Sequence, residues 1–374
     1  MISTIKRKLF CYKKKIIRYP INEKSQININ ALRINYFDIL RIISSFAVII
    51  IHVSARYNSL NCNNYNYKIG FFYNGVSRFG VPIFFMISGA LFLNKDISFE
   101  KIFKKYIRKI IIHLISWSFI YSFYSIKYSN FNFNKIIINF FSGHFHFWYL
   151  YITIQLYIIV PFLREIVKKQ SLFKAFIILS FVFTFLFSYL NKIKSFCHKL
   201  LSKILNVIYL NLKNKYLRGH IFYFILGYYL NNSMNIDIYK KILFYSLGLI
   251  GFFFIIIFYY LSIKYHQSMI PFYFRPLNLN ILAYSIGIFV FFKHNFNNIS
   301  IKYMKFIKII SSHTFGIYLI HPMIINIIRG RNDSFLSSLN LIYKIPLMSL
   351  ITFLFSFMIS IIIKYLPFIG NWLV

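Results

Sequence analysis

The stretch that decides the fold runs from Tyr36 to Ala55 and reads YFDILRIISSFAVIIIHVSA. As a helix it is long enough to cross the ~30 Å hydrocarbon core of a bilayer, which needs roughly 20 apolar residues. It also carries three ionisable residues that a plain anchor does not need, Asp38, Arg41 and His52. Ionisable residues inside a membrane span are costly and point to function.

Arg41 and His52 share one face of this helix. At about 100° per residue, their spacing gives three turns plus roughly 20°, and at 1.5 Å per residue they lie ~16 Å apart along the axis. Asp38 precedes Arg41 by one turn and is placed to orient the guanidinium group by an ion pair. The alternatives are that Arg41 extends to the lipid headgroups and that His52 bonds a neighbouring helix.

Composition indicates an all-α polytopic membrane protein. The chain has 374 residues, is 58% hydrophobic, and has a mean hydropathy of +0.60, with its apolar residues in repeated long runs. The net charge of +37 comes from basic clusters between these runs, as membrane topology requires, so we expect no nucleic acid partner. Cys11, Cys62 and Cys197 lack the spacing of a metal site, and a Cys62–Cys197 disulfide stays an alternative.

We expect a basic cytoplasmic tail over 1–33, a transmembrane domain over 34–366 and a short C-terminal tail over 367–374. The tail and the loops on its side carry 26 of the 44 Lys and Arg residues, which places both termini in the cytoplasm. Residues 192–218 form the largest segment on the outer side. About ten transmembrane helices are expected, over 36–55, 75–93, 107–126, 147–163, 173–190, 219–231, 240–262, 277–292, 307–328 and 345–366.

This topology suggests a reaction across a slot. Arg41 would hold an anionic group near the cytoplasmic face, and the His52 imidazole, with its pKa near neutrality, would act as a general base ~16 Å deeper. Coenzyme A fits such a slot, because its phosphates and its thioester lie at opposite ends of a long neutral arm. Lys104, Lys105 and Arg108 would add phosphate contacts. The alternative is that they only mark a cytoplasmic loop.

Several residues near the expected outer side are candidates for binding an acceptor. Arg78 would bind an acceptor or carbonyl oxygen, or else extend to the headgroups. Trp148 offers a stacking face and His146 a hydrogen bond to a sugar, although an interfacial aromatic belt explains them equally well. Tyr318 and His321 would face the slot or bond between helices. The His-x-His motif at 144–146 has no neighbouring carboxylate or cysteine, so we expect no metal.

Five further residues have other expected roles. Pro322 should free a backbone carbonyl group on the preceding turn. Ser88 and Gly89 should allow close helix packing, as small residues do in membranes. Arg164 and its neighbour Glu165 should pair with headgroups or with the mouth of the slot.

Four stretches together resemble acyltransferase family 3, membrane proteins that include bacterial surface-polysaccharide O-acyltransferases. They are FDILRIISSFAVIIIHV (37–53), SRFGVPIFFMISGALFL (77–93), HFHFWYLYITIQLYIIVPFLR (144–164) and SSHTFGIYLIHPMII (311–325). The first matches a family pattern in which ten residues separate a basic residue from a histidine. The last matches the family's Tyr-x-x-His-Pro ending. The resemblance covers about 34–366.

The resemblance implies a bacterial inner-membrane enzyme. His52 would be the catalytic histidine, with Arg41 as the paired basic residue. The family's cytoplasmic Arg-x-x-Arg corresponds to 105–108, where Lys105 replaces the first arginine. An acyl group, expected to be acetyl, would pass from acyl-coenzyme A, a co-substrate rather than a bound cofactor, to a carbohydrate or lipid-linked saccharide acceptor. The alternatives are a polysaccharide transporter or flippase, or an acyltransferase for a lipid or small molecule.

Overall fold

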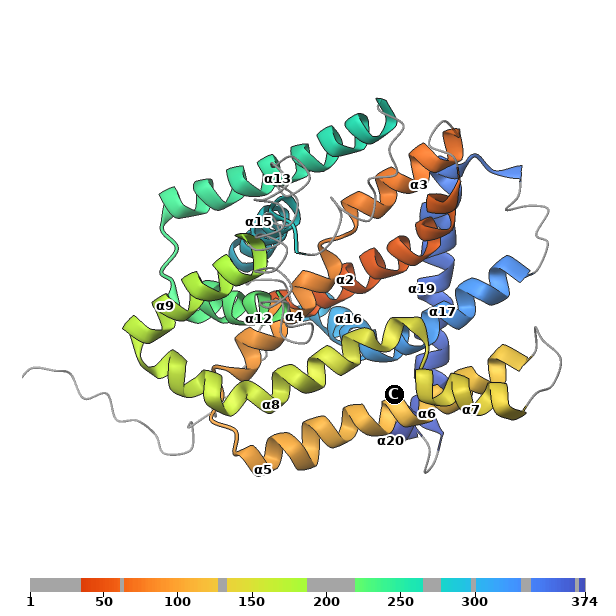
Figure 1. Cartoon of the computed structure of the whole chain (residues 1–374), viewed down its shortest axis with the longest axis horizontal. Helices are drawn as coiled ribbons and strands as arrows, with labels where there is room; N and C mark the ends of the chain where they lie inside the picture. Colours follow the sequence, from red (N-terminus) through yellow and green to blue (C-terminus); the bar gives the residue numbers. More distant parts are fainter. Residues whose placement is uncertain are drawn as a thin grey trace, which may run out of the picture. The chain divides into compact units, whose positions relative to one another are not determined.

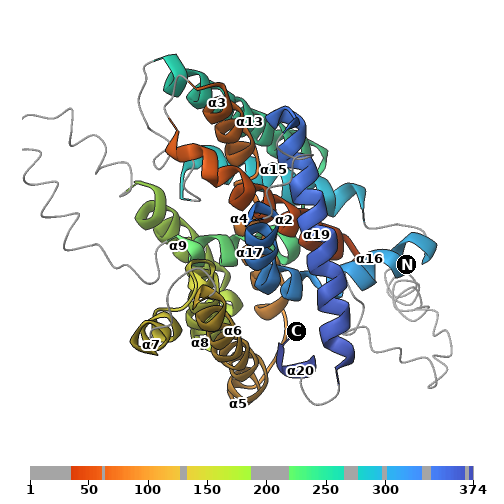
Figure 2. The same ribbon diagram turned by 90° about the vertical axis from the view of Figure 1, so that its right-hand side faces the viewer.

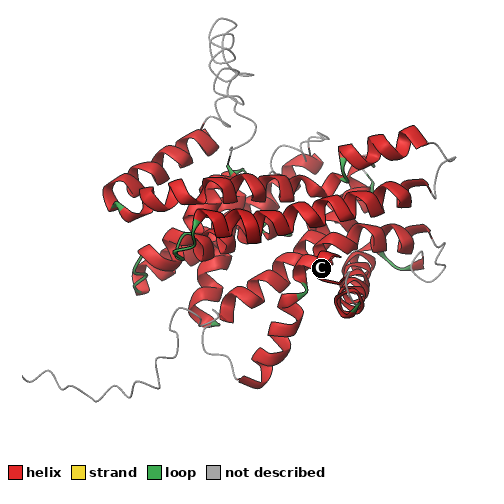
Figure 3. Ribbon diagram, turned by 90° about the horizontal axis from the view of Figure 1, so that it is seen from below, coloured by secondary structure: helices red, strands yellow, loops and turns green. Residues whose placement is uncertain are grey.

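The computed structural model describes residues 35–60, 64–126, 133–186, 219–264, 277–296, 301–330, 338–366 and 370–373. All secondary structure in these ranges is helical (Figure 3). The expected basic tail, the 192–218 segment and the three cysteines lie outside the described residues.

The helices and short helical turns follow one another along the chain (Figure 1). Their bounds are α2 (Asn35–Ser54), η3 (Ala55–Ser59), α3 (Tyr65–Val76), α4 (Gly80–Phe92), α5 (Phe99–Lys101), η4 (Ile102–Ile107), α6 (Arg108–Ile126), α7 (Phe133–Ser142), η5 (Phe145–Phe147), α8 (Trp148–Lys168), α9 (Gln170–Phe181), η6 (Val182–Leu186), α12 (His220–Tyr228), η8 (Tyr229–Ser233), α13 (Ile238–Lys264), α15 (Leu279–Asn295), α16 (Ile301–Ser312), α17 (Thr314–Gly330), α19 (Leu341–Tyr365) and α20 (Gly370–Leu373).

The predicted class, an all-α polytopic membrane protein, is confirmed. Five helical stretches among the described residues are long and apolar enough to cross a membrane. They are Asn35–Tyr57, Tyr65–Phe92, Phe133–Lys168, Ile238–Lys264 and Leu341–Tyr365. The count of about ten spans and the placing of the termini stay predictions.

Two expected spans differ in the structure. The span expected over 75–93 is the second half of a longer stretch, in which α3 and α4 are separated by a turn at 77–79. Asn64 begins α3, because its side chain accepts a hydrogen bond from the Asn66 N–H group at 2.8 Å. The span expected over 307–328 is divided at His313, whose Nδ1 lies 2.9 Å from Ser360 Oγ on α19.

Helix α17 lies between two clusters of apolar side chains. On one side Ile317 and Ile325 pack with residues of α2 and α19, and on the other Leu319 and Ile324 pack with residues of α6 and α8. Figure 2 shows α17 close to α2 and α19, with α6 and α8 below them. Residues on α17 therefore contact both the α2–α19 side and the α6–α8 side of the structure.

Helices α4 and α12 meet through backbone contact, as the small residue at 89 predicts. A Cβ atom at Gly89 would overlap the backbone of Phe224, and one at Gly227 would overlap the backbone of Met86. Close approach of this kind is typical of small residues at membrane helix interfaces. This approach holds one face of α4 against α12, while Gly80 on α4 lies against Ser44 of α2.

Replacing Gly89 with leucine should separate α4 from α12 and destabilise the protein. Overpacking of this kind costs about 1–3 kcal/mol or more, since backbone atoms must move. The melting temperature of the detergent-solubilised protein would measure the loss. Ala175→Leu on the exposed side of α9 is the matched control. Equal melting temperatures for the two variants would contradict the close approach.

Candidate active site

A cavity of about 240 Å³ lies between α2, α4, α8 and α17. Arg41 and His52 both line it, which confirms the prediction that they face one space. The lining residues are Arg41, Val48 and His52 from α2; Val81, Phe84, Ile87, Ser88, Leu91 and Phe92 from α4; His146, Trp148, Tyr149 and Tyr157 from η5 and α8; and Thr314, Phe315 and Tyr318 from α17.

The two ends of the cavity differ, because imidazole groups line one end and phenyl and phenol rings line the other. Imidazole and aromatic groups gather at one end, around His52, His146 and Trp148. We call this the His52 end. At the other, the Phe92 end, the rings of Phe92 and Tyr157 lie 4.1 Å apart. The α8 residues that line the cavity span about nine residues, or roughly 14 Å of helix, so the space is long and narrow.

Arg41 is held within the protein by an ion pair. Its Nη1 atom donates to Asp38 Oδ1 at 2.9 Å, and the Ser311 hydroxyl group on α16 donates to the same oxygen at 2.7 Å. Asp38 is fully buried, as are its neighbours Tyr36 and Phe37. The partly exposed guanidinium group of Arg41 also lines the cavity, which favours the interpretation that it faces the slot.

His52 lies where α2 ends, and other helices hold this end in place. Arg329 on α17 donates from Nη2 to the carbonyl oxygens of His52 at 3.0 Å and Val53 at 3.1 Å. The last carbonyl groups of a helix have no partner within the helix, so this guanidinium group caps them. The His52 ring contacts Phe145 and His321, with ring centroids 5.3 and 5.1 Å away.

Three more histidines surround the His52 end. The ring of His146 lies 5.6 Å from that of His321, and its Nδ1 atom lies 2.6 Å from Nδ1 of His144. His144 stacks on Tyr121 with centroids 4.1 Å apart. Gly143 precedes this group with a φ of +68°, a conformation that suits glycine and turns the chain from α7 into α8. Over the described ranges, no three potential ligands are grouped to hold a metal ion.

The Tyr-x-x-His-Pro motif has a direct structural meaning. Pro322 has no N–H group, so it cannot donate to the carbonyl oxygen of Tyr318 four residues earlier. The Nδ1 atom of His321 lies 2.7 Å from that oxygen and occupies the place of the missing donor. The Tyr318 hydroxyl group donates to the carbonyl oxygen of His146, which ties α17 to the segment before α8.

The other acceptor-binding candidates differ in position. His146, Trp148 and Tyr318 line the cavity, whereas Arg78 and His321 are not among the lining residues. Arg78 donates from Nε to Asn74 Oδ1 at 2.9 Å. Asn74 in turn donates to the carbonyl oxygen of Ile51 and to Ser54 Oγ, both at 3.1 Å. Arg78 thus helps to fix the end of α2.

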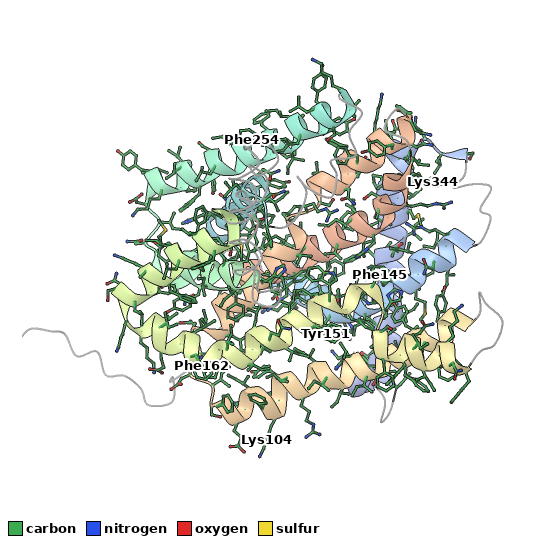
Figure 4. The ribbon with its side chains drawn as sticks, viewed as in Figure 1. Lys104, Phe145, Tyr151, Phe162, Phe254 and Lys344 are labelled. Carbon is green, nitrogen blue, oxygen red and sulfur yellow. The ribbon has the colours of Figure 1, made fainter. Side chains whose placement is uncertain are left out.

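The basic cluster lies outside the cavity. Lys104 pairs with Glu100 at 2.5 Å on the surface, and Lys105 and Arg108 are exposed. Between them, Tyr106 packs on Phe92 with ring centroids 4.9 Å apart. This contact places the basic segment beside the Phe92 end. In Figure 4, Lys104 and Phe162 are labelled in the lower part of the view, and Phe145 lies above them and to the right.

Arg164 is expected to pair with headgroups or with the mouth of the slot, and in the structure it lies beside the Phe92 end of the cavity. It is buried, and its guanidinium group donates to the carbonyl oxygens of Phe92 and Ile97, closing the end of α4. Glu165 pairs instead with Lys168 at the surface. Of the two small residues, Ser88 lines the cavity while Gly89 makes the helix contact.

Sequence reasoning missed Arg329, Tyr149 and Tyr157. Arg329 stands just after the expected span 307–328, where a basic residue is ordinary for membrane topology. The two tyrosines belong to a helix rich in aromatic residues and carry no distinct signal. In the structure, both tyrosines line the cavity together with Arg41 and Ser88.

Replacing Arg329 with methionine should destabilise the end of α2. The change leaves two carbonyl groups without their charged donor, and a hydrogen bond to a charged group contributes about 1.5–3 kcal/mol. The melting temperature of the solubilised protein should fall clearly below that of Lys305→Met, a control that removes an exposed charge on α16. An unchanged melting temperature would argue against the capping role.

Comparison with known proteins gives one match. The acyltransferase domain of acyltransferase family 3 matches residues 34–365. Searches among curated proteins and among solved structures gave no match. The matched range contains all four helices that form the cavity, together with the Arg41 and His52 pair. The chain is a multi-pass membrane protein that belongs to acyltransferase family 3, and is thus an acyltransferase.

Proposed function

We propose that this acyltransferase moves an acetyl group from acetyl-coenzyme A to a hydroxyl group of a cell-surface polysaccharide or its lipid-linked precursor. The observation that carries the proposal is the single cavity lined by Arg41 and His52. A guanidinium group and an imidazole ~16 Å apart along one helix match the phosphate and thioester ends of the pantetheine arm.

The size of the cavity supports a narrow donor. At about 240 Å³ it is smaller than the ~300–1,000 Å³ usual for pockets that enclose a drug-sized ligand. The cavity therefore suits the pantetheine arm, while the nucleotide and most of the saccharide stay outside. The exposed cations Lys104, Lys105 and Arg108, beside the Phe92 end, would meet the nucleotide phosphates there.

His52 would act as the general base. Its imidazole takes the proton of the acceptor hydroxyl group, and the hydroxyl oxygen attacks the thioester carbonyl carbon. The tetrahedral intermediate then collapses, the carbon–sulfur bond breaks, and the leaving thiolate receives the proton from His52. One C–O bond replaces one C–S bond, and no net proton is released. Trp148 and His146 would hold the sugar at this end by stacking and hydrogen bonding.

The orientation follows from the charge distribution. With the Phe92 end and its basic segment toward the cytoplasm, coenzyme A enters from the compartment that holds it. The His52 end then faces the outer side of the bacterial cytoplasmic membrane, where a lipid-linked saccharide is presented.

Replacing His52 with alanine should abolish transfer from labelled acetyl-coenzyme A in membranes. General bases contribute about 10²–10⁴-fold to rate, so kcat should fall by at least 10²-fold. His294→Ala, near the end of α15 and not among the residues lining the cavity, is the control. Undiminished transfer in the His52 variant would remove the catalytic role.

Replacing Lys104, Lys105 and Arg108 together with glutamine should raise KM for acetyl-coenzyme A by about tenfold. Exposed ion pairs contribute roughly 0.2–1 kcal/mol each, and salt should weaken the effect. Acetyl-pantetheine lacks the nucleotide phosphates, so its KM should not change. An equal rise for both donors would show that the cluster acts on the fold rather than on the phosphates.

A further inference from the structure

We propose that His321 is a positioning residue for His52: its Nε2 atom accepts a hydrogen bond from the His52 ring and selects the tautomer that acts as base. The inference rests on the proposed function of His52. It assigns His321 a role other than acceptor binding, because His321 is fully buried and is not among the residues that line the cavity.

The backbone of α17 sets the tautomer of His321. Its Nδ1 atom lies 2.7 Å from the Tyr318 carbonyl oxygen and 3.2 Å from that of Ile317. A carbonyl oxygen only accepts hydrogen bonds, so Nδ1 must carry the proton. In the neutral ring Nε2 then holds a lone pair. Pro322 makes this arrangement persist, since it removes the competing donor to Tyr318.

The Nε2 atom of His321 is a buried acceptor that can take a hydrogen bond from a nearby donor. Among the described residues it has no hydrogen-bond partner, and buried polar atoms of this kind are rare. The His52 ring lies 5.1 Å away, centroid to centroid. His144 and His146, with centroids 4.8 Å apart, already place two ring nitrogens 2.6 Å from each other. A small rotation of His52 would give the same kind of contact.

The proposed hydrogen bond from His52 to His321 would determine which nitrogen of His52 can accept a proton. A neutral imidazole has one N–H group and one lone pair, and only the lone pair takes a proton. Donating the N–H group to His321 leaves the other nitrogen of His52 as the base for a hydroxyl group in the cavity. When His52 becomes an imidazolium, its bond to Nε2 becomes charge-assisted and stronger. A carboxylate performs this orienting role in serine hydrolases.

Other charged groups and imidazoles surround the His52–His321 pair. Arg78 and Arg329 bring positive charge near His52, and His146 and His144 lie on the side of His321 toward η5. His146 is the competing donor for Nε2, with centroids 5.6 Å apart, but one of its nitrogens already contacts His144. His52 is the nearer of the two rings.

Two amide substitutions test the role. In His321→Gln the side-chain oxygen reaches the place of Nε2, whereas in His321→Asn it reaches only the place of Nδ1. We expect the Asn variant to lower kcat by about 10²-fold with KM for acetyl-coenzyme A within about twofold, and the Gln variant to retain activity within about tenfold. Equal losses in the two variants, or a loss confined to KM, would overturn the proposal.

A measurement on the wild type covers the case in which both variants fail to fold. In protein labelled with ¹⁵N-histidine, Nε2 of His321 should be an unprotonated acceptor whose signal changes in His52→Ala. A protonated Nε2 would overturn the inference. Full acetyl transfer by His52→Ala would instead overturn the proposed function, so the two failures are distinguishable.

Discussion

The hydrogen bonds that fix α2 at both ends are the constraint on which the site depends. Near its start, Asp38 accepts from Arg41 and Ser311, and at its end Arg329 donates to two carbonyl oxygens. The hydrocarbon core of a membrane offers no water to satisfy such groups, so each must find a partner within the protein. Satisfying these groups sets the depth and rotation of α2, and therefore the direction in which Arg41 and His52 face.

Helix α17 provides one of these partners, Arg329, and also lies between the two apolar clusters. Its apolar residues join the clusters on both sides, while Arg329 caps α2 and Tyr318 bonds the backbone at His146. The helix begins just after the break at His313, which puts Thr314 and Phe315 on the cavity wall. A continuous helix over 307–328 would not place Ser311 against Asp38 and Thr314 against the cavity in the same way.

The features that sequence could predict depend on local periodicity. Arg41 and His52 were expected on one face because helix geometry alone decides it, and long unbroken apolar runs marked α13 and α19. The breaks at 77–79 and at His313, and the capping by Arg329, depend on contacts between distant segments. A basic residue at the end of a span has an ordinary topological explanation, so Arg329 carried no signal that set it apart.

The scarcity of acidic residues limits which side chains can orient the proposed general base, His52. The chain has seven Asp and Glu residues against 44 Lys and Arg, and the buried Asp38 is already paired with Arg41. A carboxylate beside His52 would need its own charged partner in a medium of low polarity. In the proposed arrangement, a neutral imidazole whose tautomer is set by a backbone carbonyl group orients His52 without burying a negative charge. Pro322 leaves the Tyr318 carbonyl oxygen without its usual backbone donor, so the proline has a chemical consequence beyond the shape of the helix.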